Sequence, residues 1–218
     1  MHSPASLVLA SNSPRRKDIL RILGYPFEVV KPLTPEVFHS TDVSLPEITE
    51  RLALAKARQV AASFADSVII AADTLVSIDN DVLGKPLNEA EARKMLWKLR
   101  GRTHTVVTGV ALLSTSKDLT QNWSLTSLVS MRPYSQDEVE RYLATGAYAD
   151  KAGAYGIQDA SFSPADSVAG CYLNVVGLPL CTLAENLPKH GVNSKPAWKG
   201  IEPGNCSACK MWQEGVRE

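Results

Sequence analysis

The chain has 218 residues, of which 44% are apolar, and its 23 lysines and arginines balance its 23 aspartates and glutamates. This length supports a buried core without disulfide bonds, and zero net charge excludes the basic field by which proteins bind nucleic acids or anionic membranes. The apolar runs are far shorter than the roughly 20 residues of a membrane helix. No lysine or arginine precedes the first of them, as it would in a signal peptide. We therefore expect a cytoplasmic protein with a small-molecule partner and no stable nucleic-acid or membrane partner.

The first predicted elements are a strand, a turn and a helix. Leu7–Ala10 is a short apolar run typical of a buried strand, and Ser-Asn-Ser at 11–13 forms the turn. Ser13 can cap the helix, and Pro14 suits its first position because no backbone donor is needed there. We expect this helix to end at Gly24.

Three further helices and four further strands follow from capping signals and apolar patterns. The helix starts are Ser44–Glu47, Asn88–Glu91 and Ser135–Glu138, and the helices are expected to run to about Ala65, Leu99 and Gly146. The strands are expected at Ser67–Ile78, Thr103–Ser114, Ser124–Met131 and Gly170–Val176, with a turn at 79–81. Strands and helices therefore alternate, as in an α/β fold.

The C-terminal part of the chain differs in composition. From residue 189 to 218, glycine, proline, asparagine and lysine dilute the apolar pattern, so an extended or partly disordered tail is predicted after a domain of residues 1–188. Cys206 and Cys209 have the spacing of half a zinc site, but no second pair follows, and an unliganded thiol pair is favoured. All four cysteines are predicted to be reduced thiols because they do not resemble a secreted disulfide framework.

The start of the first helix is a candidate phosphate site. Arg15 and Arg16 lie in its first turn, where free N–H groups and the helix dipole favour an anion. Arginine can bind phosphate oxygens with two hydrogen bonds, and the hydroxyls of Ser11 and Ser13 add donors. The alternative is a capped surface helix with two solvated arginines.

Asp73 is the candidate acidic centre. It interrupts an apolar run where a strand is expected to end, so its carboxylate needs a cation or hydrogen-bond donors. Magnesium is held by one or two carboxylates plus phosphates, and Glu36 could supply the second carboxylate. The alternative is a turn aspartate bonded to Thr74. Lys85 could pair with phosphate or lie solvated in a loop, and for Lys56 an ordinary surface lysine is the favoured interpretation.

The glycine-containing segment Lys151–Gln158 is a candidate base-recognition loop. Its glycines permit close backbone approach, and the amide of Gln158 both donates and accepts hydrogen bonds. That combination could recognise the edge of a nucleobase. The alternative is a glycine-rich loop with no special role.

Taken together, these segments resemble the Maf family of nucleoside triphosphate pyrophosphatases. The matching stretches, in order, are Leu9–Arg16, Ala72–Thr74, Gly84–Pro86, Leu99–His104, Thr108–Val110, Asp150–Gln158 and Asn174–Pro179. They extend over roughly Leu7 to Leu187 and follow the family's order and spacing. Asp159 departs from the glycine common in the dTTP- and UTP-acting branch, which this chain otherwise resembles.

The resemblance implies an elongated mixed β-sheet flanked by helices, two lobes with a nucleotide-binding cleft between them, and a homodimer. It implies hydrolysis of dTTP or UTP to the monophosphate and pyrophosphate with Mg²⁺ or Mn²⁺. The implied catalytic residues are Asp73, Glu36, Lys56 and Lys85, with Glu36 and Asp73 also holding the metal; the implied substrate-binding residues are Ser11, Ser13, Arg15, Arg16, Thr74 and Gln158. The rival interpretation is a non-catalytic nucleotide-binding regulator of cell division.

Overall fold

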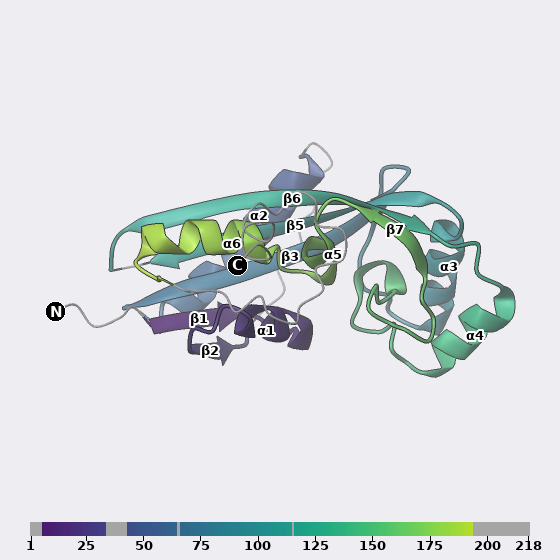
Figure 1. The fold of residues 1–218 in the computed structure, drawn as a ribbon, viewed down its shortest axis with the longest axis horizontal. Helices are drawn as coiled ribbons and strands as arrows, with labels where there is room; N and C mark the ends of the chain where they lie inside the picture. The colour runs from purple at the N-terminus through teal and green to yellow at the C-terminus, as the bar shows by residue number, and fades with distance from the viewer. Residues whose placement is uncertain (1–5, 34–42, 65, 115, 194–218) are drawn as a thin grey trace, which may run out of the picture.

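The fold is built on one seven-stranded mixed sheet (Figure 1). The computed structural model describes residues 6–33, 43–64, 66–114 and 116–193. Its strands are β1 Ser6–Ala10, β2 Phe27–Val30, β3 Ser67–Ile78, β4 Asp81–Leu83, β5 Thr103–Ser114, β6 Leu119–Met131 and β7 Ala165–Ala169. They are ordered β2-β1-β3-β5-β6-β7, and β4 pairs with β3. β1 is parallel to β2 and β3 and the other pairs are antiparallel, which confirms the predicted mixed sheet.

Helices cover both faces of this sheet. They are α1 Pro14–Arg21, α2 Leu45–Ala61, α3 Glu89–Leu99, α4 Gln136–Ala144, α5 Tyr172–Val176 and α6 Leu180–Asn186, with 3₁₀ turns at Ala152–Ala154 and Leu187–His190. α2 packs on one face through small residues such as Ala53 and Ala57, while α1, α5 and α6 share a core on the other face. The predicted α/β class is confirmed.

The long strands join two lobes (Figure 1). At one end of β3, consecutive side chains point to opposite faces of the sheet. Ile69 belongs to the core under α2, and Ile70 belongs to the core under α1, α5 and α6. Farther along the same strand, Val76 and Ile78 belong to a second core with α3 and α4. Because strand side chains alternate between faces, a single strand contributes to all three cores.

The predicted helix starts are confirmed by their caps. The side chains of Ser13, Ser44, Asn88 and Ser135 each accept a hydrogen bond from a backbone N–H in the first turn. Glu138 also accepts from the N–H of Ser135, which completes a reciprocal capping box and, with Arg132, lowers the pKa of Glu138 to about 2.

Several expectations about the elements are wrong. The first helix ends at Arg21 and not at Gly24, and β6 begins at Leu119 and not at Ser124. Gly170–Val176 is not a strand: β7 ends at Ala169, and Tyr172–Val176 is helix α5. A short apolar run cannot distinguish a strand from a buried helix turn, and the less apolar 165–169 forms the strand instead. The second helix ends at Ala61, short of the predicted 65. Cys181 is disulfide-bonded, which contradicts the prediction of reduced thiols for that residue.

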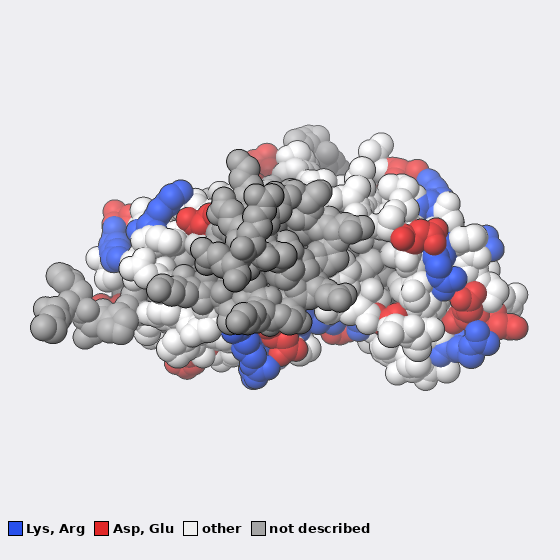
Figure 2. All heavy atoms as spheres, viewed as in Figure 1, with Lys and Arg blue, Asp and Glu red and all other residues white. Residues whose placement is uncertain are grey.

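Charges of both signs are interspersed on the described surface, as over the α3–α4 end in Figure 2. There, Arg93 of α3 forms ion pairs with Glu89 at 2.8 Å and with Glu140 of α4 at 2.7 Å. Among the described residues, no helix is long and apolar enough to cross a membrane. The predicted tail lies mostly outside the described residues, although Val192 is buried against the α6 core.

Candidate active site

Most of the predicted site residues lie where β1 ends and β3 continues. Ala10, the last residue of β1, pairs with Ala71 of β3. Beyond this pair, the next residues of β3 include Asp73 and Thr74, so Asp73 lies within the strand and not at its end. Because β1 and β3 are parallel, this is the carboxyl end of β1, where ligands commonly bind in α/β folds. Helix α1 begins in the same place.

Arg16 of α1 is held by two acceptors from distant segments. Its Nε donates to the backbone oxygen of Gly177 at 2.8 Å, and an Nη donates to Oγ1 of Thr74 at 3.0 Å. Burial lowers the pKa of the Arg16 guanidinium, against the opposite effect of the Asp73 carboxylate. An arginine stays charged in proteins, so a desolvated cation is fixed here. The interpretation of Arg16 as a solvated surface residue is wrong.

Asp73 forms an ion pair with Lys56 of α2. The side chains of Lys56 and Asp73 are 20% and 15% exposed, so the pair is largely shielded but still accessible. Burial is the largest cause that lowers the pKa of Lys56, the charges of Arg16 and Lys85 lower it further, and Asp73 opposes them. The favoured interpretation of Lys56 as an ordinary surface lysine is therefore wrong, because its side chain is shielded and paired with the predicted acidic centre.

A glycine seats α2 against the sheet beside this ion pair. Gly109 of β5 lies opposite Asp73 in the β3–β5 ladder. A Cβ atom on Gly109 would overlap the backbone of Thr49 and Glu50 in α2. Glu50 also accepts hydrogen bonds from Asn122 and Ser124 of β6 at 3.0 and 2.7 Å. This close approach sets the height of α2 above the strand and thereby places Lys56 next to Asp73.

The other predicted phosphate ligands surround the start of α1. Ser11 is buried and its hydroxyl accepts from the N–H of Ser13, whose own hydroxyl caps the helix. Arg15 donates a hydrogen bond to the side chain of Asp150 at 2.9 Å. Asp150 immediately precedes the predicted base loop. Lys85 is exposed in the loop after β4.

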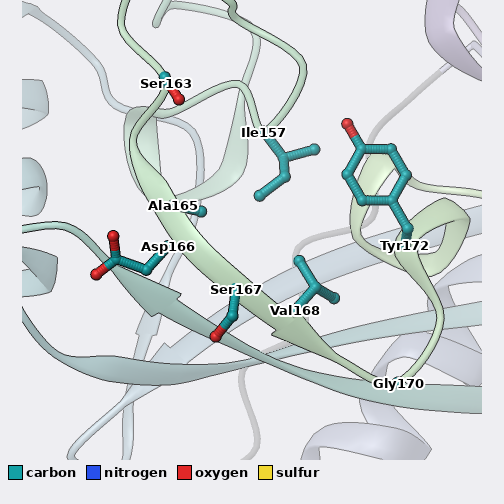
Figure 3. Close-up of a pocket in the computed structure, with 8 residues that line it drawn as sticks. All are labelled: Ile157, Ser163, Ala165, Asp166, Ser167, Val168, Gly170 and Tyr172. Atoms are coloured by element: carbon teal, nitrogen blue, oxygen red, sulfur yellow. The ribbon is translucent and has the colours of Figure 1, made fainter. Parts of the chain in front are cut away.

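The predicted base loop borders a cavity between the lobes. Gln158 is exposed, and its neighbour Ile157 lines a cavity of about 220 Å³ together with β7 and Tyr172. In Figure 3, Ile157, Val168 and Tyr172 face one another, while the carboxylate of Asp166 points away from Tyr172. Three apolar side chains therefore share this cavity with the polar residues Ser163, Asp166 and Ser167.

Asp159, the residue that departs from the resembled branch, bonds within its own loop. Its Oδ1 accepts from the N–H and hydroxyl of Ser161 and from the N–H of Phe162, at 3.1, 2.7 and 2.9 Å. A carboxylate that accepts three local donors stabilises a tight turn. Asp159 thus shapes the loop that carries Gln158.

At the end of β1, Arg16 and Lys56 lie close to the carboxylate of Asp73, and the charge of Lys85 acts on Lys56, whereas Arg15 pairs with Asp150. Glu36 lies outside the described residues. Within the described part of the chain, no cluster of three or more histidine, cysteine or acidic side chains could hold a metal by itself. A lone carboxylate among phosphate-binding cations suits a magnesium-type ion whose remaining ligands are phosphate oxygens and water.

Sequence reasoning did not assign roles to several residues of this site. Asp150, Thr108, Asn174 and Gly177 were recognised only as parts of matching stretches, yet each contacts a site residue or its immediate partner. Their partners are 34 to 161 residues away along the chain. Local patterns carry no signal for contacts of that separation.

The sequence is similar to known proteins over most of its length. A family model described as Maf-like protein matches residues 6–190. A protein named dTTP/UTP pyrophosphatase from Dehalococcoides mccartyi (strain ATCC BAA-2100 / JCM 16839 / KCTC 5957 / BAV1) is 42% identical over 96% of this chain and 93% of its own length. One with the same name from Dictyoglomus thermophilum (strain ATCC 35947 / DSM 3960 / H-6-12) is 45% identical over 85% and 96%.

A solved HAM1 protein from Coxiella burnetii has 18% identity and a TM-score of 0.42, over 61% of this chain and 75% of that chain. The matched family region contains every described residue assigned above to the site. With the order of motifs, the family match and relatives above 40% identity in agreement, the chain belongs to the Maf family.

Proposed function

We propose that this protein hydrolyses nucleoside triphosphates to the monophosphate and pyrophosphate, with dTTP and UTP as preferred substrates, and so removes unwanted nucleotides. The observation that carries the proposal is the meeting of Arg16, Lys56 and Asp73 at the carboxyl end of β1. The site combines fixed positive charge for a phosphate chain with a carboxylate that can act on water. The names of the relatives support the substrate.

The phosphate chain binds at the start of α1. The hydroxyls of Ser11 and Ser13, the free N–H groups of the helix and the guanidinium of Arg16 supply donors. Arg16 has five N–H groups, and the described contacts with Gly177 and Thr74 use two of them. The remaining donors are free to bind phosphate oxygens in a geometry that exists before the substrate arrives.

Asp73 orients and deprotonates the attacking water. The water oxygen forms a bond to the α-phosphorus, the bond from that phosphorus to the bridging oxygen breaks, and pyrophosphate leaves. The ion pair with Lys56 holds the Asp73 carboxylate in place at the end of β1, where it can accept the proton of the water. A Mg²⁺ or Mn²⁺ ion held by Asp73 and Glu36, when bound, supplies charge neutralisation on the phosphates. Lys85 adds positive charge at the open side of the site.

The base binds in the cavity between the lobes. Tyr172, which lines the cavity, begins α5, and Gly177, which Arg16 contacts, follows its end. At 1.5 Å per residue, about 7.5 Å of helix axis separates the backbones of these two residues. A pentose can bridge that separation. Gln158 carries an amide that complements the carbonyl and N–H groups of uracil or thymine. Where the bound base covers this exposed amide, a base that leaves it unpaired is disfavoured by about tenfold to hundredfold.

A nucleotide panel with product analysis tests this function. Purified protein with Mg²⁺ or Mn²⁺ is expected to release pyrophosphate and monophosphate from UTP and dTTP faster than from CTP, GTP, ATP or 7-methyl-GTP. Orthophosphate and diphosphate as direct products would contradict the reaction. A purine preference would contradict only the base assignment. Tight nucleotide binding without turnover would favour the non-catalytic regulator of cell division.

We also propose a homodimeric, cytoplasmic enzyme with the nucleoside triphosphate as its partner. Light scattering coupled to size-exclusion chromatography measures the oligomeric state of the full chain directly. A mass near twice 23.6 kDa is expected, and a monomer at micromolar concentration would contradict the dimer.

A further inference from the structure

A line of buried hydroxyl groups connects Arg16 to helix α5. The guanidinium donates to Thr74 at 3.0 Å, the hydroxyls of Thr74 and Thr108 lie 2.9 Å apart, and Thr108 bonds to the backbone oxygen of Asn174 at 2.8 Å. Thr108 and Asn174 are both 0% exposed. The line thus crosses from α1 through β3 and β5 to α5.

The chemistry at its two ends fixes the direction of every hydrogen bond in this line. A guanidinium can only donate, and a backbone carbonyl can only accept. Thr108 therefore gives its single proton to the oxygen of Asn174, and the proton shared by the two threonines must come from Thr74. That leaves Thr74 to accept from Arg16, which is the arrangement that holds the arginine best.

The second acceptor of Arg16 is also anchored through Asn174. Arg16 Nε donates to Gly177, the residue that ends α5. Within α5, the side-chain amide of Asn174 donates to the backbone oxygen of Val106 at 3.3 Å and to the hydroxyl of Ser127 at 3.0 Å. These bonds pin the short helix to β5 and β6. Both protein contacts of Arg16 thus depend on one buried asparagine.

We propose that Thr108 and Asn174 are positioning residues that orient Arg16 toward the phosphate chain, an inference that rests on the proposed function for its substrate. Neither contacts the substrate. Their effect is to hold the guanidinium in one orientation, so that binding does not have to order a long flexible side chain. When the line is broken at Thr108, Thr74 loses its acceptor and Arg16 loses its fixed partner.

The test uses two substitutions at Thr108 and a matched control. Thr108→Val keeps the shape but removes the hydroxyl, and is expected to raise KM and lower kcat/KM for UTP about tenfold, the scale of one hydrogen bond to a charged group. Thr108→Ser restores the hydroxyl and is expected to stay within about threefold of wild type on the same scale. Tyr134→Phe removes an equally buried hydroxyl, which donates to the backbone oxygen of Leu96 in the α3–α4 core, and should keep wild-type kinetics.

A double-mutant cycle shows whether Thr108 acts through Arg16. In an Arg16→Ala background, Thr108→Val should cause no further loss of kcat/KM. A full further loss there, or an equal loss in Tyr134→Phe, would overturn the proposal in favour of a general effect on the fold.

Binding of inorganic tripolyphosphate, measured by calorimetry, separates this proposal from the proposed function. If the wild type hydrolyses no nucleotide but Thr108→Val still weakens tripolyphosphate binding, the function fails and the positioning role stands. If Thr108→Val leaves tripolyphosphate binding unchanged, or if the wild type does not bind it, the positioning role is overturned.

Discussion

Asp73 and Lys56 form an ion pair in which each side chain is at most one fifth exposed. Removal of one member of a shielded pair leaves the other charge uncompensated, so the two residues act as one unit. The positive charges of Arg16 and Lys85 lie close enough to this pair to lower the pKa of Lys56. A bound triphosphate would bring the negative charge that this excess of cations can accommodate.

Asp73→Asn is expected to lower kcat by about a hundredfold or more, the scale of a positioned general base, because the amide cannot accept a proton from water. The protein should stay folded, since asparagine keeps the shape of the side chain. Steady-state kinetics and a thermal melt on the same preparation check both statements. Near-native turnover with an unchanged melting temperature would transfer the role to Glu36.

His104 makes stability depend on pH. His104 is 2% exposed, and its Nε2 atom forms a hydrogen bond with the Tyr155 hydroxyl at 2.7 Å. Its Nδ1 atom has no hydrogen-bond partner among the described residues. Burial lowers the pKa of His104 from 6.5 to about 4. Between these values the unfolded chain binds the proton and the folded protein does not. Stability from this group is therefore complete above pH 6.5 and falls as the pH drops toward 4.

The expected loss is up to about 1.4 kcal/mol per pH unit in that window. Urea unfolding of the wild type and His104→Gln at pH 7.5 and pH 5 measures it. The wild type should lose more stability than the variant on going to pH 5. Equal losses in both proteins would show that His104 does not titrate in this way.

The role of a residue can be predicted from the sequence where its neighbours along the chain are enough to define it. The capping serine and the arginines follow from the rules of a helix start, and Asp73 from the cost of a charge in an apolar strand. Thr108 and Asn174 could not be found, because their hydroxyl and amide partners depend on which strands lie side by side.

At the level of elements, α2 is placed by the absence of a side chain at Gly109. The backbones of helix and strand approach so closely there that even a methyl group has no room. Strand neighbours then place Gly109 opposite Asp73. One glycine therefore links the packing of a helix to the position of a site lysine two turns along it.

Gly109→Ala is expected to lower the free energy of unfolding by about 1–3 kcal/mol, the cost of overpacking a core. It should also lower kcat, because α2 must move outward and carries Lys56 with it. Urea unfolding and kinetics of the purified variant measure the two effects. Normal stability combined with normal turnover would show that α2 is not seated at this point.

Elements with explicit start signals were predicted well, and those without them were not. All four capped helices have the expected starts. The short helices α5 and α6 have no side-chain cap, and α5 was expected to be a strand. Its residues favour either conformation, and only packing under β5 and β6 decides between them.

For the whole molecule, the site is assembled from both lobes. Arg15 of α1 bonds to Asp150, which precedes the base loop, and the cavity is lined from both sides. The pairing of α1 with a segment 135 residues later could not be foreseen from composition or periodicity. The family resemblance did supply the mixed sheet and the two lobes, because motif order carries topology that local patterns lack.

Removal of divalent metal is expected to abolish turnover of UTP, since two or more phosphates beside Asp73 would repel it without compensation. Dialysis against a chelator, followed by addition of Mg²⁺ or Mn²⁺, should remove and then restore pyrophosphate release. A thermal melt of the chelated protein controls for unfolding. Full activity in excess chelator would contradict the metal requirement.

β3 and β5 pair without interruption from Val68 with Ser114 to Ser77 with Thr105, and β6 continues the ladder on the other side of β5. From Thr105 to Ser114, β5 is therefore paired on both sides, and its residues belong to the cores of both lobes. A strand with neighbours on both sides has little freedom to bend, so we expect the spacing of the lobes to change little when a nucleotide binds. If the base binds between the lobes as proposed, a base too large for that spacing would be rejected by its shape.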